Sequence, residues 1–216
     1  MNRYQVAHLE EIEEVHDGRC SFRPVRHHFG LTTFGVNTWT ARAVGDRLIN
    51  DHDESDEFDG DELYLVLSGR ARFEIDGDRV DASAGAFVAV AAGINRAAFA
   101  EQPDTTLVAI GGGPEGKPYR PLGWEVWSLL QPLFAAGRHE EVVAQAEPLL
   151  QAESHYPMVL YNVACSEIAL GRTEDALGHL RRAVEVMPKV GDYARDDERL
   201  AALRGNPAFS QITGGG

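Results

Sequence analysis

Short apolar or alternating runs, separated by turn signals, fill the first half of the chain. Turn signals such as Ser68-Gly69 and Asp76-Gly77 bound several of these runs, which cover residues 31–40, 62–67, 70–75, 87–90 and 105–110. Alternation with period two between glycine-containing turns predicts strands. Many short strands at regular spacing predict an all-β sandwich or barrel. The stretch 50–61 is charged almost throughout, so we expect an exposed loop there.

The pattern changes after residues 111–118, which read Gly-Gly-Gly-Pro-Glu-Gly-Lys-Pro. Neither a strand nor a helix continues through this composition. Beyond it, apolar residues recur at helical spacing in 124–136, 140–152, 158–170 and 173–186. Gly137, Gly171 and Pro188 supply the stop signals between these segments. The sequence therefore predicts a β domain over 1–113, a linker over 114–123 and a helical domain over 124–216.

The helical part repeats itself with an offset of 34 residues. Gly137-Arg138 and Gly171-Arg172 open similar segments, and Gly205 lies another 34 residues on. A period of 34 with two helices per unit resembles the tetratricopeptide (TPR) repeat. The second unit carries the pattern best, with large, small, turn and stop residues at Leu160, Val163, Ala164, Gly171, Ala176, Leu180, Ala183 and Pro188. The units lie near 124–156, 157–190 and 191–216, the last one truncated.

The TPR resemblance implies an all-α repeat domain that binds a partner protein. Each repeat buries its apolar face only on its neighbours, so three repeats or fewer are near the limit of independent stability. We therefore expect the helical domain to be stabilised by packing against the β domain or against another subunit. Trp124 and Trp127 either make that contact or fill the helical core.

The β domain resembles the cupin family at two motifs. Glu62 precedes Gly69 with six residues between them, and Gly85 opens a second similar segment that runs to residue 99. The resemblance implies an RmlC-like, jelly-roll-like cupin barrel. In cupins the first motif supplies two His and a Glu, the second supplies a third His, and together they hold a divalent metal.

The metal-binding positions depart from the cupin pattern. Residues 55–58, in the window of the two motif-one histidines, contain no His, and Arg96 stands at the motif-two histidine. A guanidinium is always protonated and has no lone pair for a metal. It does form two-pronged hydrogen bonds with a carboxylate. We therefore predict that a Glu62–Arg96 ion pair fills the space where other cupins hold metal, and that no cofactor is bound.

In an alternative interpretation, the β domain retains a metal site. If the acidic loop carries an insertion, His52, Glu54 and Glu62 together supply one imidazole and two carboxylates, which suit iron or manganese. The resemblance then implies a metal-dependent dioxygenase or isomerase acting on a small molecule. If no metal is bound, His52 is a solvated residue of an acidic loop. A metal-free epimerase of this fold would use a His–Asp pair with a Tyr, and the sequence offers no convincing pair.

Strand alternation predicts the rest of the pocket. If Glu62 points inward, Tyr64 and Val66 do so too, while Leu63, Leu65 and Leu67 face outward. Those leucines then need a cover from a second sheet, a partner subunit or the helical domain. Earlier strands add Arg26 and one of His27 and His28, since neighbours on a strand face opposite sides. The predicted ligand pocket comprises Glu62, Arg96, Tyr64, Asn37, Trp39 and His28.

Charge and composition limit the partners. The formal net charge is −14, with 20 acidic and 10 basic residues in 1–113 and 14 and 10 after it. A negative surface repels phosphate backbones, so we expect no nucleic acid partner. No apolar run approaches the roughly 18 residues that cross a bilayer, and the acidic start is unlike a secretory signal. The two cysteines, Cys20 and Cys165, fit a reducing compartment, so we expect a cytoplasmic protein with no membrane partner.

Together these features favour a non-enzymatic cupin–TPR protein. The barrel would bind a small molecule or act as a scaffold, and the helices would bind a protein. The metal-dependent enzyme is the alternative, followed by a purely structural or regulatory oligomer. Cupins often pair edge strands, which closes an exposed sheet edge, so the resemblance also implies a homodimer.

Overall fold

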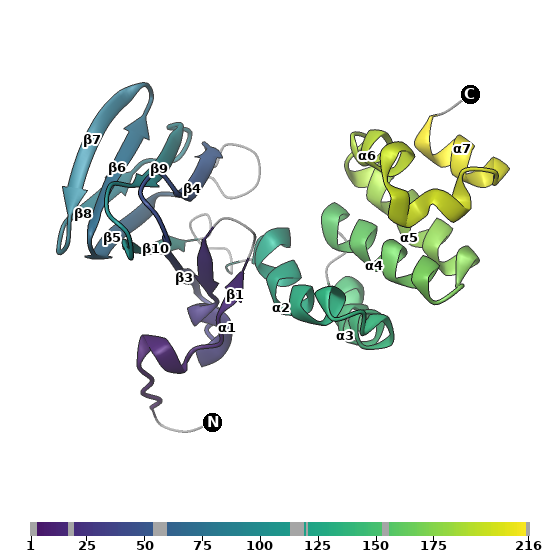
Figure 1. Cartoon of the computed structure of the whole chain (residues 1–216), viewed down its shortest axis with the longest axis horizontal. Coiled ribbons are helices and arrows are strands. Elements are labelled where there is room, and N and C mark those ends of the chain that lie inside the picture. Colours follow the sequence, from purple (N-terminus) through teal and green to yellow (C-terminus); the bar gives the residue numbers. More distant parts are fainter. Residues whose placement is uncertain are drawn as a thin grey trace. The chain divides into compact units, whose positions relative to one another are not determined.

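The computed structural model describes residues 4–16, 20–53, 60–112, 119, 121–152 and 156–214. The chain divides into two compact units, Met1–Pro121 and Leu122–Gly216 (Figure 1). The predicted linker over 114–123 lies mostly outside the described residues.

Strands of the N-terminal unit form two antiparallel sheets (Figure 1). The six-stranded sheet contains, in spatial order, β1 (Val15–His16), β2 (Ser21–Arg23), β3 (Phe34–Thr40), β10 (Thr106–Gly112), β5 (Glu62–Ser68) and β8 (Phe87–Val90). The four-stranded sheet contains β4 (Arg47–His52), β9 (Arg96–Ala100), β6 (Arg70–Ile75) and β7 (Asp78–Ser83). Short helices η1 (Leu9–Glu11) and α1 (Val25–Phe29) precede β3. Closure of the two sheets into a barrel stays a prediction.

The two sheets share one apolar core. Tyr64, Val66 and Leu107 from the six-stranded sheet cluster with Leu48 and Phe73 from the four-stranded sheet, and all are almost fully buried. On β6, Ala71 and Phe73 face this core while the intervening charged residues face outward. This is the alternation that the sequence predicts for a strand with one buried face.

The predicted strands appear as β3, β5, β6, β8 and β10, but others were not predicted. β7 and β9 were missed, and the predicted loop over 50–61 is wrong at its start, because Asn50–His52 belong to β4. Pairing with β9 holds these polar residues in a strand. The β6–β7 hairpin turns at Asp76-Gly77, where both residues have positive φ (48° and 88°), as a type I′ turn requires.

The placement of His28 on a strand is wrong. Residues Val25–Phe29 form helix α1, which starts after Pro24 and ends at Gly30 in the left-handed conformation (φ 64°). Pro before the first turn and Gly at the C-terminus are helix boundary signals. Side chains in so short a helix do not alternate between two sheet faces, and His28 is exposed.

The C-terminal unit is helical. It contains α2 (Gly123–Ala135), α3 (His139–Ala152), α4 (Pro157–Ala169), α5 (Thr173–Val186), α6 (Val190–Asp196), η2 (Glu198–Leu203) and α7 (Pro207–Thr213) (Figure 1). The first four helices match the predicted helical segments to within one residue. In the part of this unit that the structure describes, no helix has the length and apolar character to cross a membrane.

The residues that carry the 34-residue pattern pack in the core of this unit. Leu160, Ala164, Ala176, Leu180 and Ala183 are all fully buried. The small side chains of α4 and α5 let the two helices approach closely. Gly171 turns the chain between these helices at a positive φ of 75°. Assignment of these helices to the TPR family remains a proposal.

Candidate functional site

A polar cluster lies between the two sheets, centred on the carboxylate of Glu62. Glu62 opens β5 in the six-stranded sheet, while His52 on β4 and Arg96 on β9 belong to the four-stranded sheet. His52 and Arg96 are direct cross-strand partners, so their side chains project side by side. Tyr64 lies two residues after Glu62 and therefore on the same face of β5. The cluster links the two sheets through one carboxylate.

One oxygen of Glu62 accepts every hydrogen bond that the cluster makes with it. Arg96 donates to Oε2 through Nε (3.2 Å) and Nη2 (3.0 Å), and the Tyr64 hydroxyl donates to the same oxygen. Arg96 also donates through Nη1 to the carbonyl of Ile94 (2.8 Å). The Arg96 side chain has no exposed surface and that of Glu62 is 17% exposed. The structure thus brings together Glu62, Arg96 and Tyr64, three of the predicted pocket residues.

His52 completes the cluster from its more exposed side. Its Nδ1 lies 2.8 Å from the carbonyl oxygen of Asn50, and its Nε2 lies 3.3 Å from Glu62 Oε2. A carbonyl oxygen only accepts, so Nδ1 donates there. Because Nε2 also faces an acceptor, both contacts are satisfied when both ring nitrogens carry a proton.

The surroundings fix the charge states of the acidic groups. Burial alone raises the pKa of Glu62, but hydrogen bonds from His52 and Tyr64 and the charge of Arg96 outweigh it and lower the pKa below its ordinary value. Burial first, and then the charge of Glu62, raise the pKa of Tyr64 strongly. At neutral pH, Glu62 is therefore ionised and Tyr64 is protonated.

The cross-strand row that contains Glu62 also contains two glycines, which have no side chains. Gly111 pairs with Glu62 on one side and with Gly35 on the other, so all three share the inner face. A Cβ built at Gly111 would lie 3.7 Å from Cγ and Oε1 of Glu62, and no other non-neighbouring atom of the described residues would lie within 4 Å. A methyl group at Gly111 would therefore be in ordinary van der Waals contact with the Glu62 side chain.

Tyr119 closes the far side of this row. A Cβ at Gly35 would come within 2.5 Å of the Tyr119 hydroxyl, so the ring lies directly against the Gly35 backbone. The guanidinium of Arg26, on α1, lies 5.7 Å from the centre of the Tyr119 ring. Arg26 was predicted on a strand and is instead on a helix, beside Tyr119.

Asn37 and Trp39 lie on the same inner face, two and four residues along β3 from Gly35. Asn37 is in register with Ala109, which is in register with Tyr64. Asn37 is 4% exposed, and its Oδ1 has no hydrogen-bond partner among the residues that the structure describes. A buried polar atom without a partner costs free energy. Trp39 packs beside Phe22, with ring centres 5.3 Å apart.

The predicted metal set is only partly described. Glu54 lies outside the described residues, whereas His52 and Glu62 are in contact. Within the described ranges, no three His, Cys, Asp or Glu side chains are grouped so as to hold a metal ion. Sequence reasoning missed Gly111 and Tyr119, because both fall in the glycine- and proline-rich segment that reads as a domain boundary.

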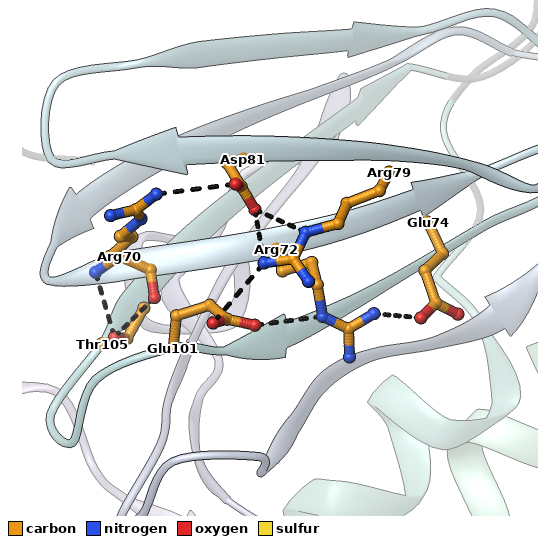
Figure 2. Close-up of polar contacts among 7 residues, drawn as sticks. All are labelled: Arg70, Arg72, Glu74, Arg79, Asp81, Glu101 and Thr105. Atoms are coloured by element: carbon orange, nitrogen blue, oxygen red, sulfur yellow. Dashed lines mark hydrogen bonds and ion pairs between the residues drawn. The ribbon is translucent and has the colours of Figure 1, made fainter.

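A second group of Arg–carboxylate pairs lies on the outer face of the four-stranded sheet (Figure 2). Arg72 donates to Glu74 on its own strand and, through Nε, to Glu101 (3.0 Å). Arg79 lies 3.1 Å from Asp81 and 3.7 Å from Glu101. These side chains retain roughly a fifth to three fifths of their surface (21% for Arg72 and 59% for Arg79). We call this group the surface lattice.

No protein-family model matches the chain, and no curated protein matches it. Solved structures similar to its N-terminal half include cupin and RmlC-like proteins. An RmlC-like cupin from Shewanella frigidimarina is 12% identical, covering 52% of this chain and 94% of that one, with a TM-score of 0.40. A cupin protein from Bacteroides fragilis is 19% identical, covering 56% and 93%, with a TM-score of 0.41. A sugar phosphate isomerase of a cupin superfamily from Silicibacter pomeroyi is 22% identical, covering 51% and 76%, with a TM-score of 0.41. Similarities this weak carry no inference about the activity of this chain.

Proposed function

We propose that the N-terminal unit is a metal-free cupin that binds a small molecule, and that the helical unit binds a partner protein. The observation that carries this proposal is the ion pair between Glu62 and Arg96. Two N–H groups of the Arg96 guanidinium donate hydrogen bonds to Oε2 of Glu62. The same oxygen accepts a hydrogen bond from the Tyr64 hydroxyl and contacts Nε2 of His52. A divalent cation at that oxygen would lie beside a buried positive charge.

The protonation states favour binding over proton transfer. A general acid or base works best when its pKa lies near the operating pH. The pKa of Glu62 is lowered and that of Tyr64 is raised, so both move away from neutrality. Neither group exchanges its proton readily near pH 7, whereas both present fixed hydrogen-bonding groups to a ligand.

The inner face beside Gly111 and Glu62 is the proposed ligand position. Oε1 of Glu62 lies 3.7 Å from where a Cβ at Gly111 would be and is a hydrogen-bond acceptor, and Oδ1 of Asn37, which has no partner among the described residues, lies on the same inner face. A ligand that carries hydrogen-bond donors, such as hydroxyl groups, would satisfy both oxygens. Because Arg96 already compensates the charge of Glu62, a neutral ligand fits this position better than a cation.

Two glycine substitutions test this position. Gly111→Ala adds a methyl group at ordinary contact distance from Glu62, so the protein should fold while the methyl group occupies the proposed ligand position. Gly112→Ala is the matched control, because Gly112 points to the opposite face and a Cβ there would have no atom of the described residues within 4 Å. A library of neutral polar compounds would be screened by thermal shift with wild type and both variants. Hits lost in Gly111→Ala and kept in Gly112→Ala support the proposal, and hits unaffected by either change contradict it.

A metal-dependent enzyme is the second candidate. The Asn50 carbonyl orients the His52 ring so that Nε2 faces Glu62, as backbone acceptors often orient metal-binding histidines. His52 and Glu62, with Glu54 from the acidic segment, would hold the ion. Iron or manganese bound there would supply Lewis-acid or redox chemistry. The two hydrogen bonds from Arg96 to Glu62 disfavour this candidate.

The protein-binding role of the helices rests on the repeated helix pairs and on exposed apolar side chains. Trp124, Met158 and Tyr193 retain 44%, 37% and 43% of their surface. A photo-crosslinking residue at Met158, compared with one at the exposed Glu174 on the next helix, tests this role in cells. A defined partner captured from position 158 and absent from position 174 supports it. Equal capture at both positions contradicts it.

A further inference from the structure

The aromatic ring of Tyr119 lies on the inner face of the six-stranded sheet, over Gly35. Gly35 belongs to the same cross-strand row as Gly111 and Glu62. A Cβ built at Gly35 would lie 2.5 Å from the Tyr119 hydroxyl oxygen and 2.6 and 2.8 Å from two of its ring carbons. Side chains do not pack at such distances, so the ring lies there because position 35 has no side chain. This part of the inner face therefore has the shape of an aromatic ring.

Tyr119 reaches this position from outside the strands. It follows β10, which ends at Gly112, and it belongs to neither a helix nor a strand. The pairing of the two sheets does not include Tyr119. Removal of its side chain from Gly35 therefore leaves the strand pairing unchanged. An aromatic ring of a ligand could take the same position.

Arg26 determines what kind of ring this position favours. Its guanidinium carbon lies 5.7 Å from the centre of the Tyr119 ring. Its Nη1 donates a hydrogen bond to the carbonyl oxygen of Leu31 (3.0 Å), which helps to fix the side chain on α1. A cation within about 6 Å of an aromatic centroid is attracted to the electron-rich face of the ring. A saturated ring has no such face, so Arg26 favours an aromatic ring.

Two oxygen atoms on the same inner face call for a hydroxyl group. The printed bonds of the Glu62 carboxylate all go to Oε2, so Oε1 accepts none from the described residues. Oδ1 of Asn37, two residues along β3 from Gly35, is buried and likewise has no partner among those residues. Both oxygens accept hydrogen bonds, and a hydroxyl group donates one. A ring that carries a hydroxyl group therefore matches both the shape and the polarity of this face.

We propose that the position over Gly35 and beside Arg26 is a ring subsite, which Tyr119 occupies in the free chain. The ligand of the β domain then carries a neutral, hydroxylated aromatic ring that replaces Tyr119 there. This inference rests on the proposed small-molecule binding of the N-terminal unit and specifies the chemical class of the ligand. Because the ligand competes with Tyr119, its apparent affinity is lowered by the fraction of chains in which Tyr119 fills the subsite.

The probe is p-cresol, which has the ring and the hydroxyl group of a tyrosine side chain. Tyr119→Ala vacates the subsite in the full chain, so p-cresol should raise its melting temperature in a dose-dependent manner. By calorimetry, p-cresol should bind this variant at least about tenfold more tightly than wild type. Circular dichroism verifies folding, and Tyr119→Ser is the second vacated variant if Tyr119→Ala does not fold.

Two further substitutions in the Tyr119→Ala background locate the bound ring. Gly35→Ala places a methyl group where the Tyr119 ring lay and should abolish the binding of p-cresol. Gly112→Ala is the matched control, because Gly112 faces the opposite side of the sheet and should leave binding unchanged.

A second compound tests the role of Arg26. In 4-methylcyclohexanol the hydroxyl group is kept and the aromatic face is lost, so it should bind Tyr119→Ala about two- to fivefold more weakly than p-cresol. Adding Arg26→Gln removes the cation but keeps an N–H donor for the Leu31 carbonyl. This change should remove the preference for p-cresol.

Binding of p-cresol that Gly35→Ala abolishes and Gly112→Ala preserves supports the ring subsite. A folded vacated variant that does not bind p-cresol overturns it, and so does binding that Gly35→Ala leaves intact or equal affinity for the two compounds. Failure of the proposed function gives a different result, because the screen of wild type would then yield no hits that Gly111→Ala removes. Hits without an aromatic ring that Gly111→Ala removes would support the proposed function and overturn the ring subsite.

Discussion

The N-terminal unit uses Arg–carboxylate pairs in two settings that differ in access to water. The Arg96 side chain is fully enclosed between the sheets and bonds Glu62, whereas the Arg72 side chain is 21% exposed and bonds Glu74 and Glu101 on the outer face (Figure 2). Water and salt screen the surface lattice, so its pairs add little stability. Between the sheets, loss of either partner leaves a charge without compensation. The same chemistry therefore has different consequences in the two places.

The largest expected effect is that of Arg96→Ala. This change leaves the carboxylate of Glu62 without its cation and opens a cavity between the sheets. We expect a loss of about 3–5 kcal/mol in the free energy of unfolding, measured by urea denaturation. A loss below about 1 kcal/mol would mean that solvent reaches Arg96.

A double substitution sharpens the comparison. Replacing both partners by apolar residues of similar size, Glu62→Leu with Arg96→Met, removes the buried charges together. Buried ion pairs replaced in this way are often neutral or stabilised. We therefore expect the double variant to recover at least half of the loss caused by Arg96→Ala. Additive losses would contradict a direct interaction between these residues.

An effect of intermediate size is expected when the free energy of unfolding is measured as a function of pH. The pKa of Glu62 in the folded protein lies below its ordinary value of 4.5, so its ionised form stabilises the fold above that pH. This contribution is lost as the pH falls through the lowered folded pKa. The difference in unfolding free energy between wild type and Glu62→Gln should therefore shrink between pH 6 and pH 3. A difference independent of pH would contradict ionisation of Glu62.

The smallest effect is expected in the surface lattice. Arg72→Ala removes bonds to Glu74 and Glu101, together with the stacking of the guanidinium 4.5 Å from the centre of the Phe99 ring. Pairs at this exposure contribute about 0–1 kcal/mol each, and less in high salt. Urea denaturation at low and high salt checks this expectation. A salt-independent loss as large as that of Arg96→Ala would remove the distinction between the two settings.

The sequence predicted which residues form the inner cluster better than it predicted the strands that hold them. Glu62 and Arg96 stood out because a guanidinium replaces a metal-binding histidine, and period-two alternation placed Tyr64 on the same face as Glu62. The strand containing Arg96 was missed, since Arg-Ala-Ala-Phe-Ala lacks β-branched residues and depends on pairing with β4 and β6. The role of Gly111 was missed, because the residue lies in a segment that reads as a domain boundary and its role depends on the neighbouring strand.

The helical unit was the easier part to predict. Its helices depend on local apolar periodicity and on turns such as Gly171, which the sequence displays directly. Helix α1 was missed for the opposite reason, because five residues are too short to show a helical period. The contact of Tyr119 with Gly35 joins distant segments and could not be deduced from spacing.

Metal content tests the central claim most directly. Protein purified without chelator and dialysed extensively would be analysed for iron, manganese, nickel and zinc by mass spectrometry. The Glu62–Arg96 pair predicts well under one ion per ten chains and a melting temperature that EDTA leaves unchanged. One tightly held ion per chain, lost together with thermal stability in His52→Ala, would contradict the account.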